Sequence, residues 1–253
     1  MSAEGAIRFA RFAHPPNALG YCGPSDDASV RRLAVTPALD APAVDEAEVL
    51  ALARGFEGAW PYLELLAGPT GDPLSVDVVD AYWLGGGRAD EVAADAFATH
   101  LRDRVGDRLG VPWPAVEAAI AAGGRPTHAF HVLCASPFVG LARRGAIAAA
   151  LPAIEGCRIS WGEVRSVQGT GLVVDVVPLE REDGVLRLDG ARPLARTAVA
   201  AGGAPALSAG DRVALHWDRV CDRLEPERWA RLEATTHEHL EVVERLGPVD
   251  DRT

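Results

Sequence analysis

The spacing of apolar residues divides the chain into a helical part and a strand-rich part. From Val44 to about Leu151, apolar residues recur three or four positions apart, as in Val49, Ala53 and Phe56. This period is that of one face of an α-helix. Clusters of glycine and proline, which break helices, interrupt the pattern at 68–73, 85–87 and 123–126. The pattern therefore predicts several helices joined by short connections.

Strands are expected to replace helices from about Cys157 onward. The period of the apolar positions changes to about two, first at Ile159 and Trp161 and later at Val213 and Leu215. This alternation is typical of half-buried strands. Turn-forming residues occur at hairpin-like intervals, at 168–171 and 182–184,. Several short strands with such turns indicate a small barrel.

The two ends of the chain complete the predicted fold. Pro226 suits the first turn of a final helix, and apolar residues after it fall on roughly one face,. The first forty residues, which contain several prolines, are expected to form an ordered but irregular arm. The predicted fold class is α+β. Residues 1–152 would form a mainly helical domain with this arm, and residues 153–253 a small OB-like β-barrel followed by a helix.

Charge and composition narrow the range of partners. The chain has 25 basic and 36 acidic residues, a net charge of −11. This sign is opposite to the one that neutralises phosphates, so nucleic acid is not expected as a partner. No stretch approaches 18 uninterrupted apolar residues, and residues 1–6 lack the features of a secretory signal,. The four cysteines contain no Cys-x-x-Cys pair,. We expect a cytoplasmic protein with reduced thiols and no membrane association.

Two segments of the strand-rich part carry a family resemblance. The first is CRISWGEV, residues 157–164, and the second is AGDRVALH, residues 209–216. A helix led by acidic residues follows the second segment. In this order the segments resemble the opening and the last strand of HypC/HupF proteins. The resemblance covers about residues 156–245.

The resemblance implies a function for the barrel. In HypC/HupF proteins, a cysteine and a histidine at these positions are associated with handling an iron atom that carries cyanide and carbon monoxide. They do so during assembly of nickel–iron hydrogenase. The resemblance thus implies that Cys157 and His216 bind such an iron fragment. It also implies that the partner is the hydrogenase large subunit or another maturation protein.

The chemistry of the two side chains is compatible with this role. A thiolate and an imidazole are soft enough donors for iron. Two protein ligands leave a site open, as a carrier that releases its cargo requires. Strand alternation places His216 on the face of Ala214, pointing away from the barrel core. Asp218 could orient His216 as a hydrogen-bond acceptor, if the turn brings them together.

Other residues support two competing hypotheses. His128 and His131 follow each other at a spacing of three and could share a helix face, although buried histidines with satisfied hydrogen bonds are the more frequent case. Cys22 lies in a glycine-flanked turn. An enzyme could bring Cys22, His128 or His131 and His216 together at a cleft between the two domains for thiol or metal-assisted chemistry. The remaining hypothesis is a protein-binding module without a metal.

Overall fold

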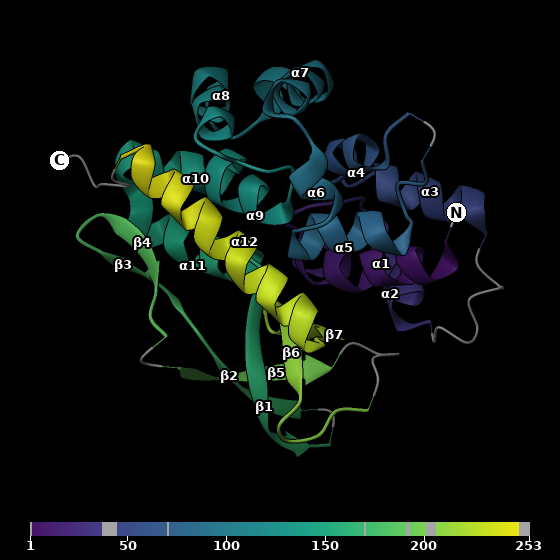
Figure 1. The fold of residues 1–253 in the computed structure, drawn as a ribbon. Helices are drawn as coiled ribbons and strands as arrows, with labels where there is room; N and C mark the ends of the chain where they lie inside the picture. Colours follow the sequence, from purple (N-terminus) through teal and green to yellow (C-terminus); the bar gives the residue numbers. More distant parts are fainter. Residues whose placement is uncertain are drawn as a thin grey trace.

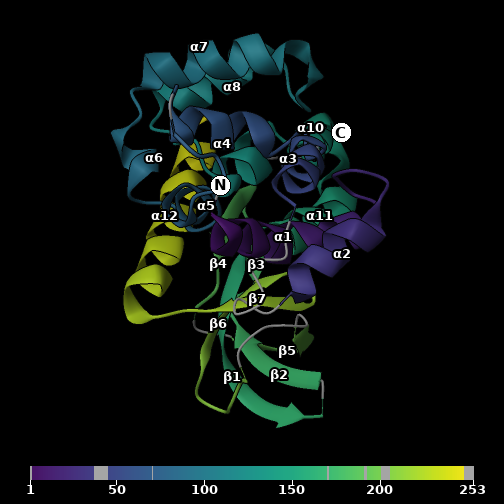
Figure 2. The same ribbon diagram turned by 90° about the vertical axis from the view of Figure 1, so that its right-hand side faces the viewer.

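The computed structural model has the predicted α+β architecture. It describes residues 2–36, 45–69, 71–169, 171–190, 193–200 and 206–247. Helices precede a small closed barrel of five strands, and one long helix follows it. In Figures 1 and 2 the barrel lies below the helices, and helix α12 (Pro226–Arg245) runs from the barrel across the helical part.

The described residues before the barrel are mainly helical, as predicted. The α-helices are α1 (Ala3–Ala18), α2 (Asp27–Val35), α3 (Glu46–Arg54), α4 (Trp60–Ala67), α5 (Val76–Leu84), α6 (Arg88–Glu91), α7 (Ala94–Arg104), α8 (Trp113–Ala121), α9 (His128–Phe130), α10 (Pro137–Leu141) and α11 (Ile147–Cys157). A 3₁₀ turn spans Gly106–Arg108. Helix α11 continues past the predicted boundary at 152/153.

The prediction of an irregular N-terminal arm was wrong for its described part. Residues 3–18 and 27–35 form helices, while 37–44 lie outside the described residues. Pro15 and Pro16 lie close to the C-terminal end of α1, where their missing N–H groups affect few carbonyls,. The helix is stabilised by burying an apolar face, which includes Ala6, Phe9, Phe12 and Ala13,.

Residues 128–157 form an interrupted helical run. Its two π-helical turns are His131–Ala135 and Ala142–Ala146, and Gly145 leaves the helical conformation with φ 93°. By length and composition this run is the one among the described residues that could cross a membrane. Half of its most apolar stretch is buried inside the protein. Core helices of soluble proteins have the same features.

The barrel strands pair in the order β1-β2-β5-β7-β6, and β6 returns to β1. All pairs are antiparallel except β5 with β7. A separate hairpin of β3 and β4 turns at Asp183 and Gly184, which both have positive φ, as the sequence predicted. The strands are β1 (Ser160–Gln168), β2 (Gly171–Val176), β3 (Leu179–Glu182), β4 (Val185–Leu188), β5 (Leu194–Ala200), β6 (Arg212–His216) and β7 (Arg219–Arg223).

The final helix and α1 join the barrel to the helical part. Helix α12 spans Pro226–Arg245 and begins at the predicted proline. Arg228 of α12 bonds Asp222 of β7 at 2.8 Å and Asp80 of α5 at 3.1 Å, and Asp80 also accepts a bond from Arg8 of α1 at 2.8 Å. These four side chains are largely buried. They therefore connect four elements that are far apart in sequence.

The barrel has its own interior and shares its outer surface with the helices. Val213 and Leu215 point into a core formed by barrel residues alone. Ala214, between them, belongs to the main core, which extends through the helical part. The alternation along β6 therefore turns every second side chain toward the helices.

Candidate functional site

Three predicted residues meet where the helices cover the barrel. We call Cys157, His128 and His216 the interface site. The imidazole of His216 lies 5.2 Å from that of His128, measured between ring centroids. The ring of Trp83 contacts both, at 5.8 Å from His216 and 4.6 Å from His128. The site is therefore assembled from α5, α9, the end of α11 and the end of β6.

His216 points away from the barrel interior, as its strand position predicted. Its side chain is 1% exposed. Nδ1 lies 2.6 Å from the carbonyl oxygen of Phe12 in α1, so Nδ1 carries the proton and donates it. Nε2 is then left with a lone pair, and this buried nitrogen has no hydrogen-bond partner among the described residues. Burial lowers the pKa of His216 to about 4, partly opposed by the carbonyls of Phe12 and Cys157, so the imidazole is neutral.

The carbonyl that orients His216 is free because of a proline. In an α-helix the oxygen of Phe12 would accept the N–H of residue 16, and Pro16 has no N–H,. The histidine supplies the missing donor. The sequence assigned the orienting role to Asp218, and this was wrong: Asp218 is exposed, and Nδ1 of His216 is already bonded to Phe12. The proline inside α1 was the one sequence signal for the free carbonyl.

His128 is a buried histidine with both ring nitrogens bonded. Nε2 lies 2.9 Å from the carbonyl oxygen of Cys157 and therefore donates. Nδ1 lies 3.2 Å from the hydroxyl of Tyr82 and accepts from it. Burial, followed by the neighbouring His216 and His131, holds the pKa of His128 well below its usual range. His128 therefore fixes the position of Cys157 and has no free nitrogen for a ligand.

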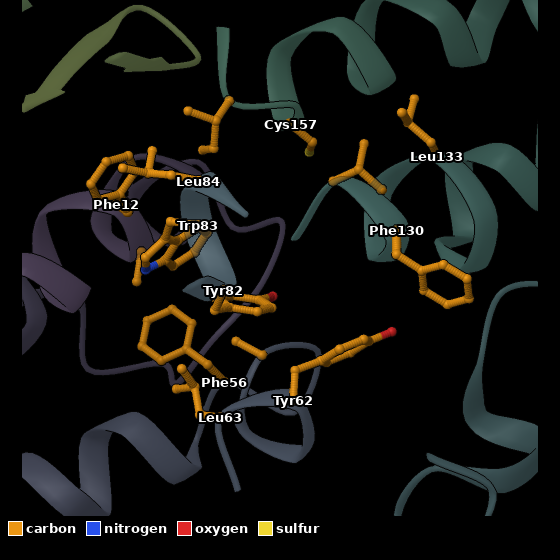
Figure 3. Packing of buried hydrophobic residues seen from close by; sticks show 14 of the residues in the cluster. Phe12, Phe56, Tyr62, Leu63, Tyr82, Trp83, Leu84, Phe130, Leu133 and Cys157 are labelled. Atoms are coloured by element: carbon orange, nitrogen blue, oxygen red, sulfur yellow. The ribbon is translucent and has the colours of Figure 1, made fainter. Parts of the chain in front are cut away.

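Cys157 is the last residue of α11 and is 9% exposed. Burial, followed by the neighbouring Cys22, raises the pKa of its thiol to about 12. Trp217 lies next to the end of α11, because its backbone N–H donates to the carbonyl of Gly156 at 2.9 Å. A side chain on Gly156 would collide with the indole, since its Cβ would lie 2.6 Å from a ring atom. In Figure 3, Cys157 borders the aromatic core that contains Trp83 and Tyr82.

Cys22 and His131 line a cavity beside the interface site. The cavity has a volume of about 400 Å³. Tyr62 of α4 also lines it. Asn17 of α1 shapes the loop that carries Cys22, because its side-chain amide donates to the carbonyls of Cys22 and Pro24 at 2.9 and 2.8 Å. The sequence had no signal for Tyr62, since its role depends on the packing of α4 against the π-helical turn.

Burial raises the pKa of all four thiols, which does not favour nucleophilic attack. Cys22 has exposed surface, yet the protein around its sulfur desolvates the thiol and raises its pKa to about 12. Burial also raises the pKa of Cys134 to about 12 and that of Cys221 still further. A low thiol pKa accompanies nucleophilic cysteines. The cysteines are therefore protonated at neutral pH.

Metal binding at the interface site would involve few protein ligands. Within the described ranges, no group of three or more His, Cys, Asp and Glu side chains is placed to hold a metal ion. Among the described residues of the interface site, the thiol of Cys157 and the unpartnered Nε2 of His216 remain as possible metal donors. Such a pair does not form a structural metal site, which usually has four protein ligands.

The fold and the site together define an α+β protein in which helices cover a histidine and a cysteine at the edge of an OB-like barrel. Comparison with protein families assigns the chain more specifically. It belongs to DUF6390, a family of unknown function, whose profile matches residues 1–248. The match includes both the helices and the barrel. No curated protein and no solved structure matches the chain.

Proposed function

We propose that this protein is a HypC-like accessory factor of nickel–iron hydrogenase maturation. It holds an iron atom that carries cyanide and carbon monoxide through Cys157 and His216, and it delivers that cargo to the hydrogenase large subunit or to another maturation protein. The resemblance of residues 157–164 and 209–216 to HypC/HupF segments supports the class. The OB-like barrel and its closing helix are the fold expected from that resemblance.

The observation that carries the proposal is the free Nε2 of His216. A buried polar atom without a partner has a free-energy cost of about 1–3 kcal/mol, and within the described part of the chain Nε2 of His216 is such an atom. A metal-binding histidine usually donates its other N–H to a carbonyl or carboxylate, which fixes the tautomer. Phe12 provides that carbonyl here. This protonation state supports a role for His216 as a metal ligand.

Two protein donors suffice for a cargo that brings its own ligands. Cyanide and carbon monoxide already occupy coordination positions on the iron, so the protein needs to supply only a few ligands. Cys157 loses its proton on binding, because the thiolate is the ligand form. An incomplete protein shell also allows transfer to a second protein.

Loading requires a local opening, because Cys157 and His216 are 9% and 1% exposed. The loop between α1 and α2 is the exposed segment beside the site. Its Tyr21 is 48% exposed and stacks on Trp217 at 4.5 Å. Cys22, the next residue, is close enough to raise the pKa of Cys157. We place the entry of the cargo at this loop.

The test is anaerobic purification from a host that expresses the hydrogenase maturation proteins. Iron content is measured per chain, together with infrared absorption in the cyanide and carbonyl stretching region. The wild type is expected to carry iron with both kinds of band. Cys157→Ala and His216→Asn should lose them. Asn at position 216 keeps a donor for the Phe12 carbonyl but has no counterpart of Nε2.

A matched control separates loss of a ligand from loss of the fold. Cys134 is buried in the helical part, distant in sequence from both motifs, and Cys134→Ala should keep iron and both kinds of band. Circular dichroism should show equal helix content in all variants. The proposal is refuted if wild type and Cys157→Ala carry equally little iron, or if His216→Asn retains the infrared bands.

The enzyme hypothesis has one supporting observation, which is that Cys22 and His131 line the same cavity. Thiol chemistry there would require a Cys22 with a lowered pKa, whereas the surrounding protein raises it to about 12. Profiling thiol alkylation against pH tests this alternative. A rate for Cys22 that is already maximal near neutral pH would favour the enzyme, and rates that rise only in strong alkali would refute thiol catalysis.

A further inference from the structure

The cavity lined by Tyr62 and His131 has the properties of a small-molecule site. Its volume of about 400 Å³ lies within the range of roughly 300–1,000 Å³ that is usual for ligand pockets. Its walls combine aromatic, aliphatic and glycine residues from the α1–α2 loop, α4 and the segments on both sides of α8. Cys22 is at the exposed end. The cavity is therefore accessible from solvent and apolar over much of its wall.

Two residues of this wall each carry a buried polar atom that has no partner within the described chain. Tyr62 is 1% exposed, and its hydroxyl makes no hydrogen bond to the part of the chain that the structure describes. The same holds for the buried Nδ1 of His131. The two rings are 5.8 Å apart and nearly perpendicular. In Figure 3 the hydroxyls of Tyr62 and Tyr82 point away from the side of the core that holds Phe56. Two adjacent unpaired groups in one cavity wall indicate a missing hydrogen-bonding partner.

The charge state of these groups restricts the ligand. Burial raises the pKa of Tyr62 and lowers that of His131 to about 4, so both are neutral near pH 7. The charged residues of the wall, Glu57 and Arg108, lie at the mouth, exposed and 3.5 Å from each other. Their charges offset one another. An ion in the inner cavity would therefore lose its hydration without gaining a counter-charge.

We propose that this cavity binds an uncharged small organic molecule whose amide or carbonyl group forms hydrogen bonds with the hydroxyl of Tyr62 and with Nδ1 of His131. A primary amide fits best, because it both donates and accepts. The apolar wall contacts the rest of the molecule. This site is separate from Cys157 and His216, so the proposal does not depend on iron binding.

The test uses benzamide, benzoate and toluene as probes of the purified protein, with dissociation constants from ligand-observed NMR titration near pH 7. Benzamide carries the amide on a flat ring, benzoate replaces it with a charge, and toluene has no hydrogen-bonding group. We expect benzamide to bind in the millimolar range or tighter. Benzoate and toluene should each bind about tenfold more weakly, as expected for the loss of one or two buried hydrogen bonds.

Substitutions at Tyr62 and His131 test whether these two side chains bind the benzamide. Tyr62→Phe and His131→Phe should each weaken benzamide binding about tenfold. The same substitution at an exposed site, His237→Phe on α12, should change it less than twofold. The proposal is overturned if toluene binds as well as benzamide, if benzoate binds more tightly, or if no probe binds. Equal affinity of the wild type and both cavity variants would also overturn it. The comparison of probes needs only the wild type, so it stands even if a variant fails to fold.

Discussion

Acidification should destabilise this protein well above the pH at which its carboxylates titrate. His131 and His216 are held neutral in the fold, because burial lowers the pKa of each to about 4. In the unfolded chain a histidine has a pKa of about 6.5. Between these values the unfolded state binds more protons than the folded state. The free energy of unfolding must therefore decrease as the pH falls from about 6.5 to about 4. At higher pH both histidines are neutral in the folded and the unfolded state, so they no longer make the free energy of unfolding depend on pH.

The size of this loss in free energy of unfolding follows from the pKa shifts of His131 and His216. Each contributes about 1.4 kcal/mol per pH unit inside this window, so together they remove about 5 kcal/mol between pH 6.5 and 4.5. The pKa values of His128 and His239 are also lowered by burial and act in the same direction. A natural domain has about 5–15 kcal/mol of stability in total. We therefore expect unfolding to begin near pH 5.

Urea denaturation followed by circular dichroism at several pH values measures the effect. The free energy of unfolding should be flat above about pH 7 and then decrease steeply. His131→Phe should reduce the slope by about 1.4 kcal/mol per pH unit. His237→Gln, at an exposed position, should leave it unchanged. The reasoning fails if the free energy of unfolding at pH 5 lies within about 1 kcal/mol of its value at pH 7.

Two further predictions concern the buried ion pairs that join the helices to the barrel and the proline that frees the Phe12 carbonyl. Asp80→Ala removes a largely buried carboxylate that pairs with two arginines and should cost about 3 kcal/mol in urea denaturation. Glu241→Ala, in an exposed pair, should cost less than about 1 kcal/mol; equal costs would contradict the prediction. Pro16→Ala restores an N–H that competes with His216 for the Phe12 carbonyl. It should lower iron content while helix content is kept, and an unchanged iron content would argue against this role of the carbonyl.

The parts of the fold that follow from local patterns were predictable. Alternating residues such as Val213 and Leu215 define β6, and the same alternation correctly turned His216 away from the barrel interior. The helical spacing before about residue 151 and the proline that begins α12 were also reliable. In these cases the buried face of one helix or strand can be read from the spacing of its own apolar residues.

The parts that depend on tertiary packing were not predictable in the same way. Prolines normally oppose helices, so residues 3–18 looked irregular, but burial of Phe9 and Phe12 outweighs that preference. Asp218 was a reasonable acceptor for His216, because it is close in sequence. The actual acceptor is a backbone carbonyl 204 positions away. The spacing of apolar residues along the sequence also could not show that Tyr62 would lie beside His131.

The C-terminal turn of α1 organises both proposed sites. Pro16 leaves the carbonyl of Phe12 free to orient His216, whose imidazole lies against His128 outside the barrel interior. One residue later, Asn17 holds the loop that forms part of the cavity wall, and this loop places Tyr21 on Trp217. A shift of this turn would therefore move the histidine and the cavity wall together. The buried apolar face keeps this segment helical despite its two prolines, and the carbonyl that Pro16 leaves unpaired is what positions His216.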